Sequence, residues 1–265
     1  MTERKDDPTA STTWGLGDYP AMARLLEPVA LAVVERAEIV PGQDVLDIAC
    51  GDGNAALLAA ARGARVTGVD YETVLLDRAA RRAEREGRSV TWIEGDAESL
   101  PVAPASADTV LSVLGIMYAQ DPLAAANEVA RVLRPDGRAV LAAWSPGSFM
   151  PSVGRVLGAY LPPVEGPAPS RWADRASVGD LLLQAGLEVV DFSVEKLELS
   201  WPDAEAAATF LIQTAGHVIG ERDRLVAEGR WDALLTELTR FVSGWADGDG
   251  VRVTLEYGMV TAVHV

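Results

Sequence analysis

The residues best suited to chemistry lie in the segment Val45-Leu-Asp-Ile-Ala-Cys-Gly-Asp-Gly-Asn54, where an apolar stretch leads into a glycine turn. Gly51 and Gly53 have no Cβ atom, so a ligand can approach their backbone closely and a positive φ costs little there. A helix is expected directly after the turn, which presents bare backbone to a ligand at a helix N-terminus. Asp47, inside the apolar stretch, favours a cationic ligand.

Two further acidic residues each follow a later apolar stretch. The segment Val66-Thr-Gly-Val-Asp70 ends in a carboxylate that could hold a ribose diol through two hydrogen bonds. Asp96, which follows Trp92-Ile-Glu-Gly95, could accept a hydrogen bond from an adenine amino group. The pattern therefore indicates a cofactor that contains a nucleoside.

A nicotinamide dinucleotide is the competing interpretation, because the spacing Gly51-x-Gly53-x-x-Ala56 also fits the dinucleotide-binding fingerprint. Asp47 argues against it, since a carboxylate at that position would lie awkwardly close to a pyrophosphate. Asp96 and a long C-terminal strand also disfavour a nicotinamide-dependent enzyme.

With Arg131-Val-Leu-Arg-Pro-Asp-Gly-Arg-Ala-Val-Leu141, these segments resemble the class I S-adenosylmethionine-dependent methyltransferases. The likeness is to the bacterial type 11 or ubiquinone/menaquinone-biosynthesis-like branch, and it covers residues 40–145. It implies S-adenosylmethionine as cofactor and S-adenosylhomocysteine as product. It also implies an α/β fold with a doubly wound, mostly parallel seven-stranded sheet, an antiparallel C-terminal strand and a helical, proline-rich lid.

The resemblance also implies which residues bind the cofactor. Asp47 would support the ammonium group of its methionine part, Asp70 the ribose, and Asp96 the adenine. The complete predicted set is Trp14, Tyr19, Asp47, Ala49, Gly51, Gly53, Asp70, Tyr71, Asp96, Ala97 and Val113.

A substrate pocket is predicted from aromatic and methionine side chains in segments that wall the substrate side of this fold. An apolar, aromatic pocket suits a hydrophobic or planar substrate. Its predicted members are Met117, Tyr118, Trp144, Phe149, Tyr160, Trp172 and Phe210. Some of these side chains are also expected only to pack the lid.

Few residues are candidates for acid–base catalysis. His217 and Tyr118 are the two candidates, and a partly buried structural role is the competing interpretation of His217. A general base is needed only when the methyl-accepting group arrives protonated. The expected mechanism is therefore mainly positioning and exclusion of water. No metal ligand set is expected, since Cys50 is the single cysteine.

Alternating patterns predict the elements that position these residues. The expected strands are residues 44–49, 65–70, 90–94, 109–113, 139–144, 188–199 and 251–265. The expected helices are residues 19–37, 54–61, 73–86, 123–133, 153–161, 178–185, 204–224 and 231–245.

Five parts are expected along the chain. They are a disordered tail (1–13), an N-terminal covering helix (14–40), the cofactor-binding core (41–145), a lid with the sixth strand and substrate-covering helices (146–250), and the final strand (251–265).

The formal net charge of −16 disfavours nucleic acid and anionic membrane surfaces as partners. A single cysteine excludes an internal disulfide and fits a reducing cytoplasm. We expect a methyltransferase acting on oxygen, nitrogen or carbon of a small, apolar or aromatic metabolite. The alternative is a protein of the same fold that binds the cofactor without methyl transfer and serves in cyclisation, rearrangement or protein interaction. The sequence leaves the oligomeric state open.

Overall fold

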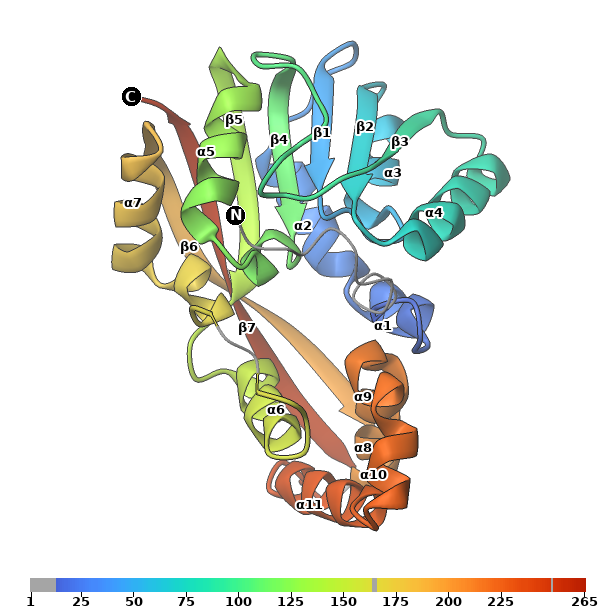
Figure 1. Ribbon diagram of the computed structural model, residues 1–265. Helices are drawn as coiled ribbons and strands as arrows, with labels where there is room; N and C mark the ends of the chain where they lie inside the picture. The colour runs from blue at the N-terminus through green and yellow to red at the C-terminus, as the bar shows by residue number, and fades with distance from the viewer. Residues whose placement is uncertain (1–12, 164–165, 249) are drawn as a thin grey trace. The chain divides into compact units, whose positions relative to one another are not determined.

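The computed structural model describes residues 13–163, 166–248 and 250–265. The tail predicted for residues 1–13 therefore lies, apart from Thr13, outside the described residues. The described chain forms a seven-stranded sheet in the order β3-β2-β1-β4-β5-β7-β6 (Figure 1). Its strands are β1 (Asp44–Ile48), β2 (Arg65–Asp70), β3 (Val90–Glu94), β4 (Ala107–Val113), β5 (Leu133–Trp144), β6 (Leu187–Trp201) and β7 (Val251–His264).

The sheet is parallel from β3 through β5. Strand β1 pairs with β2 and β4, β2 also pairs with β3, and β4 also pairs with β5. Strand β7 runs antiparallel to β5, with Ala262 opposite Ala139 and Tyr257 opposite Trp144. The prediction of a mostly parallel sheet with an antiparallel C-terminal strand is confirmed.

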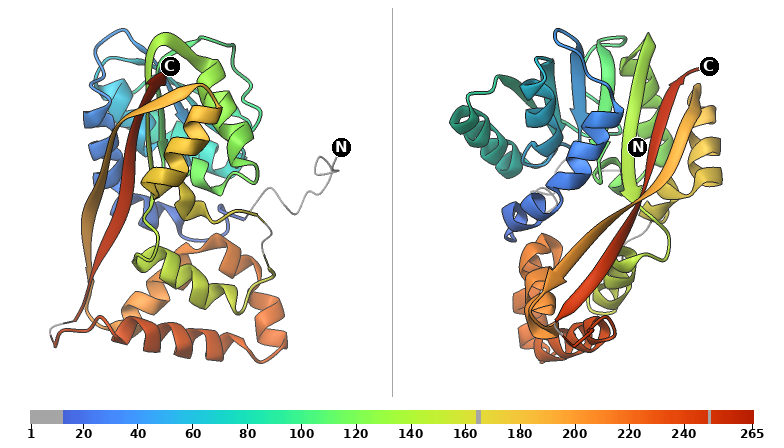
Figure 2. Two further views of the ribbon diagram at one scale, coloured as in Figure 1. Left: turned by 90° about the vertical axis from the view of Figure 1, so that its left-hand side faces the viewer. Right: turned by 180° about the vertical axis from the view of Figure 1, so that it is seen from behind.

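Helices cover both faces of this sheet. Helices α2, α3 and α4 pack on one face, and α5 and α7 lie on the other (Figures 1 and 2). The helices are α1 (Tyr19–Leu25), α2 (Glu27–Arg36), α3 (Asn54–Ala61), α4 (Thr73–Glu86), α5 (Pro122–Val132), α6 (Phe149–Gly158), α7 (Arg175–Gln184), α8 (Ala204–Thr214), α9 (Gly216–Gly220), α10 (Arg222–Ala227) and α11 (Trp231–Ser243). Two 3-10 helices, η1 (Ile116–Tyr118) and η2 (Pro169–Ala173), complete the described elements.

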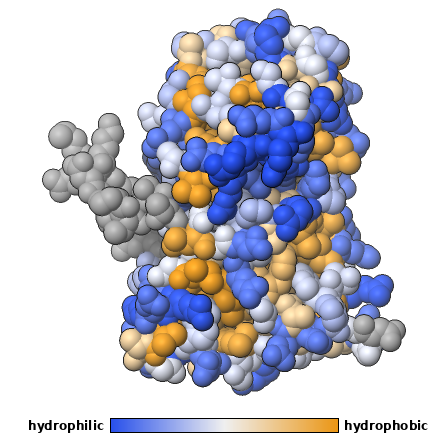
Figure 3. All heavy atoms as spheres, turned by 90° about the vertical axis from the view of Figure 1, so that its right-hand side faces the viewer, coloured by the Kyte–Doolittle hydropathy of each residue, from blue (hydrophilic) through white to orange (hydrophobic). Residues whose placement is uncertain are grey.

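Local signals explain where several helices begin and end. The Asp121 side chain caps α5 by accepting hydrogen bonds from the amides of Leu123 and Ala124. Helix α4 ends at Gly87, which has φ 63°. The buried face of α4 is formed by alanine and leucine side chains, whereas hydrophilic side chains gather over its outer face (Figure 3).

Two predicted helices are interrupted. The predicted helix 19–37 breaks at Leu26, directly before α2, whose first turn contains Pro28 and so lacks one backbone donor. The predicted helix 204–224 forms three shorter helices, with Ala215 (φ −91°, ψ 89°) and Glu221 between them. Periodicity of apolar residues alone did not reveal either break.

Strand β5 begins six residues earlier than predicted. Leu133 lies opposite Ala107, and the next pair joins Arg138 to Thr109, so the residues between them bulge out of the ladder. Within this bulge Arg134 forms ion pairs with Asp44 and Asp108. These ion pairs hold the Arg-Pro-Asp-Gly segment against the starts of β1 and β4.

The chain divides into two compact units. The core unit comprises the described parts of residues 25–152, 164–198 and 254–265, and the helical unit comprises those of residues 1–24, 153–163 and 199–253. In the helical unit α8 packs against α11, with buried leucines at 211, 234 and 238. In the described part of the chain, no helix is long and apolar enough to cross a membrane.

Candidate functional site

The glycine turn after β1 adopts an unusual backbone conformation. Ala49, Gly51 and Gly53 have φ values of 52°, 56° and 88°. A positive φ is costly for alanine and readily adopted by glycine, which explains the glycines at two of the three positions. Gly53 is the N-cap of α3 and makes no side-chain cap, so the turn leads directly into the first amides of this helix. The predicted strand–turn–helix arrangement is present.

Two buried carboxylates flank this turn. Asp47 is 1% exposed, and its Oδ2 accepts a hydrogen bond of 2.9 Å from the Ala56 amide in α3. Asp70 is 6% exposed, with Oδ2 accepting from the Gly51 amide at 2.7 Å and Oδ1 from the Glu72 amide at 2.9 Å. The turn is thus tied to the ends of both β1 and β2.

Burial makes these carboxylates difficult to ionise. It raises the pKa of Asp47 to about 8, and the nearby charge of Asp70 adds to this effect. Burial also raises the pKa of Asp70, although the amides of Glu72 and Gly51 oppose the shift. The side chain of Glu72 is fully buried as well. Such a group of acids favours a positively charged ligand.

The end of β4 lies directly against the turn. A Cβ atom at Gly115 would be 2.6 Å from the Ala49 carbonyl oxygen, so only glycine fits there without movement. Leu114 has φ 59°, which brings a second strained residue to the same place. Val113, one of the predicted cofactor-binding residues, is the last residue of β4.

Ser112 joins these segments, and sequence reasoning missed it. Its hydroxyl donates to the Ile48 carbonyl oxygen at 2.7 Å and accepts from the Ile116 amide at 3.0 Å. It therefore connects β1 to the loop after β4. A serine inside an otherwise apolar strand was the available signal.

The loop after β3 reaches the same edge of the sheet. The Gly95 amide donates to the Asp70 carbonyl oxygen at 3.0 Å. Asp96 is exposed, and its Oδ1 accepts from the Glu98 amide at 2.9 Å. Tyr71, which follows Asp70, is also exposed. The three predicted acids thus lie at or near the carboxyl ends of neighbouring strands, while the roles of Asp96, Ala97 and Tyr71 in cofactor binding stay predictions.

The Trp92 side chain in β3 packs against the glycine turn after β1, a contact that sequence reasoning missed. A Cβ atom at Gly53 would lie 2.6 Å from its ring, and a Cβ atom at Gly68 would lie 2.5 Å from it. The Cys50 sulfur would be 3.0 Å from the same Gly68 Cβ. Burial raises the pKa of the Cys50 thiol well above its usual value, so this side chain behaves as a small apolar group.

The predicted pocket residues of the core unit differ in exposure. Met117, Trp144, Phe149 and Trp172 are at most 5% exposed, whereas Tyr118 is 44% exposed. The Tyr118 hydroxyl is nevertheless buried and hydrogen-bonded to the Trp144 side chain, and burial raises its pKa to about 12. Tyr118 therefore remains protonated near neutral pH, which suits a hydrogen-bond donor better than a base.

The other predicted residues belong to the helical unit. The Trp14 and His217 rings lie 5.8 Å apart in an edge contact, and burial lowers the pKa of His217. The Phe210 ring lies 5.8 Å from that of Trp201. Tyr160 donates a hydrogen bond to Glu237 at 2.6 Å. The predicted roles of these residues and of Tyr19 in cofactor binding, substrate binding or catalysis stay predictions.

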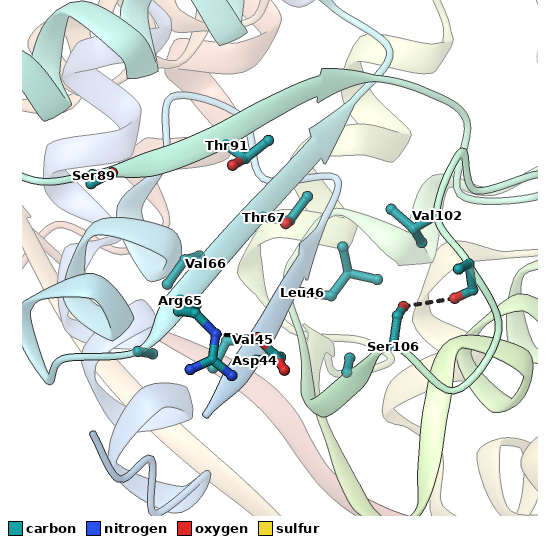
Figure 4. Close-up of a pocket in the computed structure, with 13 residues that line it drawn as sticks. Asp44, Val45, Leu46, Arg65, Val66, Thr67, Ser89, Thr91, Val102 and Ser106 are labelled. Carbon is teal, nitrogen blue, oxygen red and sulfur yellow. Dashed lines mark hydrogen bonds and ion pairs between the residues drawn. The ribbon is translucent and has the colours of Figure 1, made fainter. Parts of the chain in front are cut away.

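A groove of about 550 Å³ lies at the opposite edge of the sheet, where β1, β2, β3 and β4 begin (Figure 4). It is lined by Leu46, Thr67, Thr91 and Val102, among others, and contains the ion pair between Arg65 and Asp44. None of the predicted site residues lines it. Among the described residues, no group of three or more His, Cys, Asp or Glu could hold a metal ion.

Comparisons with known proteins identify the family of this chain. The family described as methyltransferase domain matches residues 46–141. An uncharacterized protein of Mycobacterium tuberculosis is 37% identical over 68% of this chain and 69% of its own length. Nocamycin O-methyltransferase of Saccharothrix syringae is 31% identical over 92% of this chain and 94% of its own length.

Solved structures share the fold at low sequence identity. The YcgJ protein of Bacillus subtilis superposes with a TM-score of 0.64 at 18% identity, covering 89% of this chain and 98% of that one. A Haemonchus contortus phosphoethanolamine N-methyltransferase, solved with S-adenosylhomocysteine, gives a TM-score of 0.58 at 20% identity, covering 92% of this chain and 57% of that one.

Proposed function

Because this chain belongs to the S-adenosylmethionine-dependent methyltransferases, we propose that it transfers a methyl group to a small, apolar or aromatic metabolite. Oxygen, nitrogen and carbon are the candidate methyl-accepting atoms. We favour oxygen, because the relative that matches nearly the full length of this chain is named as an O-methyltransferase. The net charge of −16 supports a small molecule rather than a nucleic acid. The single cysteine supports a cytoplasmic location.

The observation that carries this proposal is the pair of buried carboxylates beside the glycine turn. S-adenosylmethionine has an ammonium group, a sulfonium group and a ribose diol. The described hydrogen bonds to Asp47 and Asp70 come from backbone amides, and a cation bound beside these two acids would favour their ionised form. The residues present therefore fit this cofactor.

We assign the cofactor contacts accordingly. Asp47 would support the ammonium group, Asp70 the ribose hydroxyls and Asp96 the adenine amino group. Ala49 and the glycines of the turn would line the methionine part. When bound, the cofactor supplies an already activated methyl group, so methyl transfer needs little further chemistry from the protein.

The chain's own contribution is then to orient the acceptor and exclude water. Tyr118 keeps its proton because of its raised pKa, so we assign it hydrogen-bond donation rather than proton abstraction. The lowered pKa of His217 keeps its imidazole neutral near neutral pH, which is the form a general base requires. A catalytic role of His217 remains a proposal.

Calorimetric titration with S-adenosylhomocysteine, with NADH in parallel, tests the proposed cofactor site. We expect micromolar or tighter binding of S-adenosylhomocysteine and none of NADH. Asp70→Ala should weaken the binding by about 1.5–3 kcal/mol, as expected for hydrogen bonds to a charged group. Asp77→Ala removes the same charge from the exposed face of α4 and should leave the affinity unchanged.

Equal affinities in wild type and Asp70→Ala would contradict the assigned site. Methyl transfer is tested separately, by following formation of S-adenosylhomocysteine from S-adenosylmethionine with a panel of small apolar acceptors. A protein that binds the cofactor tightly but methylates none of a broad panel would instead support the alternative without methyl transfer.

A further inference from the structure

The carboxylate of Glu98 fixes the segment after β3 to the loop after β4. Its Oε1 accepts hydrogen bonds from two consecutive backbone amides, that of Gln120 at 2.5 Å and that of Asp121 at 3.1 Å. Both amides directly precede α5, whose first turn is capped by the Asp121 side chain. The negative charge of Glu98 therefore lies at the positive end of this helix, where it is favourable.

Glu98 belongs to the same turn as Asp96, the residue that we assign to the adenine amino group. The Glu98 amide donates to Oδ1 of Asp96 at 2.9 Å, and the Ser99 amide donates to the Asp96 carbonyl oxygen at 3.0 Å. Asp96 itself is exposed, so a ligand can reach it. The turn 96–99 thus carries both a proposed cofactor contact and the attachment to the loop after β4.

The loop after β4 is attached at its other end to the glycine turn. The Ser112 hydroxyl bonds to the Ile48 carbonyl oxygen at 2.7 Å and to the Ile116 amide at 3.0 Å. Helix η1, which includes Tyr118, lies between this attachment and the one at Glu98. The loop therefore connects the two segments that we assign to the methionine and adenine parts of the cofactor.

The rest of the segment after β3 is attached to α5 by a different pair of side chains. Glu128 and Arg131 form an ion pair of 2.6 Å, and Oε2 of Glu128 accepts from the Leu100 amide at 2.6 Å. Arg131 donates to the carbonyl oxygens of Leu100 at 3.0 Å and Val102 at 2.9 Å. Removal of the Glu98 carboxylate should therefore detach the turn 96–99 from the loop and leave the segment folded.

We propose that Glu98 is a positioning residue of the methyltransferase, which transmits cofactor binding at the turn 96–99 to the loop after β4. A ligand bound at Asp96 restricts the motion of this turn, and the hydrogen bonds of Glu98 then restrict the loop that carries Tyr118. Gly115 of this loop packs against the glycine turn, so the loop borders the place where the acceptor must meet the methyl group. The inference rests on the proposed function and adds how cofactor binding orders the acceptor side of the site.

Hydrogen exchange measured by NMR tests this inference. The amides of Tyr118 and Ala119 are suitable probes, because they bond to the carbonyl oxygens of Gly115 and Ile116 within the same loop and not to Glu98. Their exchange therefore reports on the order of the loop itself. We expect saturating S-adenosylhomocysteine to slow their exchange in the wild type by about tenfold.

Variants at Glu98 then show whether this slowing depends on its hydrogen bonds. In Glu98→Ala the slowing should fall to about twofold or less, whereas the affinity for S-adenosylhomocysteine should decrease by no more than about threefold, because Asp96 is retained. Glu98→Gln keeps a carbonyl oxygen that can accept both hydrogen bonds and should retain most of the slowing. Glu84→Ala removes an exposed carboxylate from α4 and should behave as the wild type.

Affinity for S-adenosylhomocysteine, measured by calorimetry in every variant, separates this inference from the proposed function. Failure of the wild type to bind S-adenosylhomocysteine would contradict the cofactor site itself. Wild-type protein that binds it without slower exchange of the two amides overturns the role of Glu98 alone. Equal slowing in wild type and Glu98→Ala also overturns that role, because direct contact of the ligand with the loop would then suffice. A loss of slowing as complete in Glu98→Gln as in Glu98→Ala would contradict positioning through these hydrogen bonds.

Discussion

At the scale of single residues, the most consequential feature is the burial of acids at the ends of β1 and β2. Asp47 and Asp70 lie close enough for the charge of one to raise the pKa of the other, and only backbone amides are described as their donors. A positively charged ligand would remove much of this cost. The acids that we propose as cofactor ligands therefore make the protein without cofactor less stable.

The pH dependence of stability follows from Asp47. Its pKa is raised from 3.8 to about 8 on folding, so its contribution favours the folded state fully below the unfolded value and is lost as the pH rises through the folded value. Asp47→Asn cannot ionise and escapes this loss. We expect the Tm of Asp47→Asn minus the Tm of the wild type to increase as the pH is raised from about 4 to about 8. Scanning calorimetry of both proteins without cofactor, at several pH values, measures this difference in Tm.

Asp77→Asn serves as the control, since its carboxylate is exposed on α4. Its Tm should follow that of the wild type across the same pH range. A constant difference between Asp47→Asn and wild type at all pH values would show that Asp47 titrates at its ordinary pKa.

At the scale of elements, the packing of Trp92 in β3 against the glycine turn after β1 holds that turn in place. The Trp92 ring fills the space left by the missing Cβ atoms of Gly68 in β2 and Gly53 at the start of α3. A Cβ at Gly53 would also lie 3.3 Å from Ala79 in α4. The Trp92 indole thus sets the spacing between β3, β2 and the start of α3.

Gly68→Ala should therefore lower the free energy of unfolding by about 1–3 kcal/mol, because the added methyl group overpacks this contact. The effect should become smaller in a Trp92→Leu background, where the ring atoms that it meets are gone. Chemical denaturation of the two single variants and the double variant measures this coupling.

Gly179→Ala in α7 is the matched control, since its added Cβ meets nothing within 4 Å. Alanine in a helix is favoured over glycine, so this variant should be as stable as the wild type or slightly more stable. Equal costs of Gly68→Ala with and without Trp92 would mean that the ring does not set the spacing.

At the scale of the whole molecule, a net charge of −16 and the buried acids of the proposed cofactor site both oppose the compact state. Added salt screens such repulsion. Cofactor binding counteracts this destabilisation more specifically. A ligand that binds only the folded protein stabilises the folded state in proportion to the logarithm of the ligand concentration.

S-adenosylhomocysteine at one hundred times its dissociation constant should therefore stabilise the folded protein by about 2.7 kcal/mol. Thermal unfolding followed by circular dichroism measures the rise in Tm. Asp70→Ala should show a smaller rise at the same ligand concentration. A similar rise with NADH would indicate that the stabilisation does not come from the assigned site.

The sequence by itself determined the central strand–turn–helix pattern. The bounds predicted for β2, α3, α4 and β3 match the structure, because apolar stretches bounded by glycine or charged residues are local signals. The glycine turn and the acids after β1 and β2 were predictable for the same reason. Each depends on residues adjacent in the chain.

Only the tertiary structure decided which distant residues support the turn. The contacts of Trp92 with Gly68, of Gly115 with Ala49, and of Ser112 with Ile48 join segments that are not neighbours in the sequence. The break after α8 has a similar origin, because an added Cβ at Gly216 would meet the Thr13 carbonyl oxygen. Such contacts depend on how elements pack, and local patterns of hydrophobicity and charge do not encode which partners they will meet.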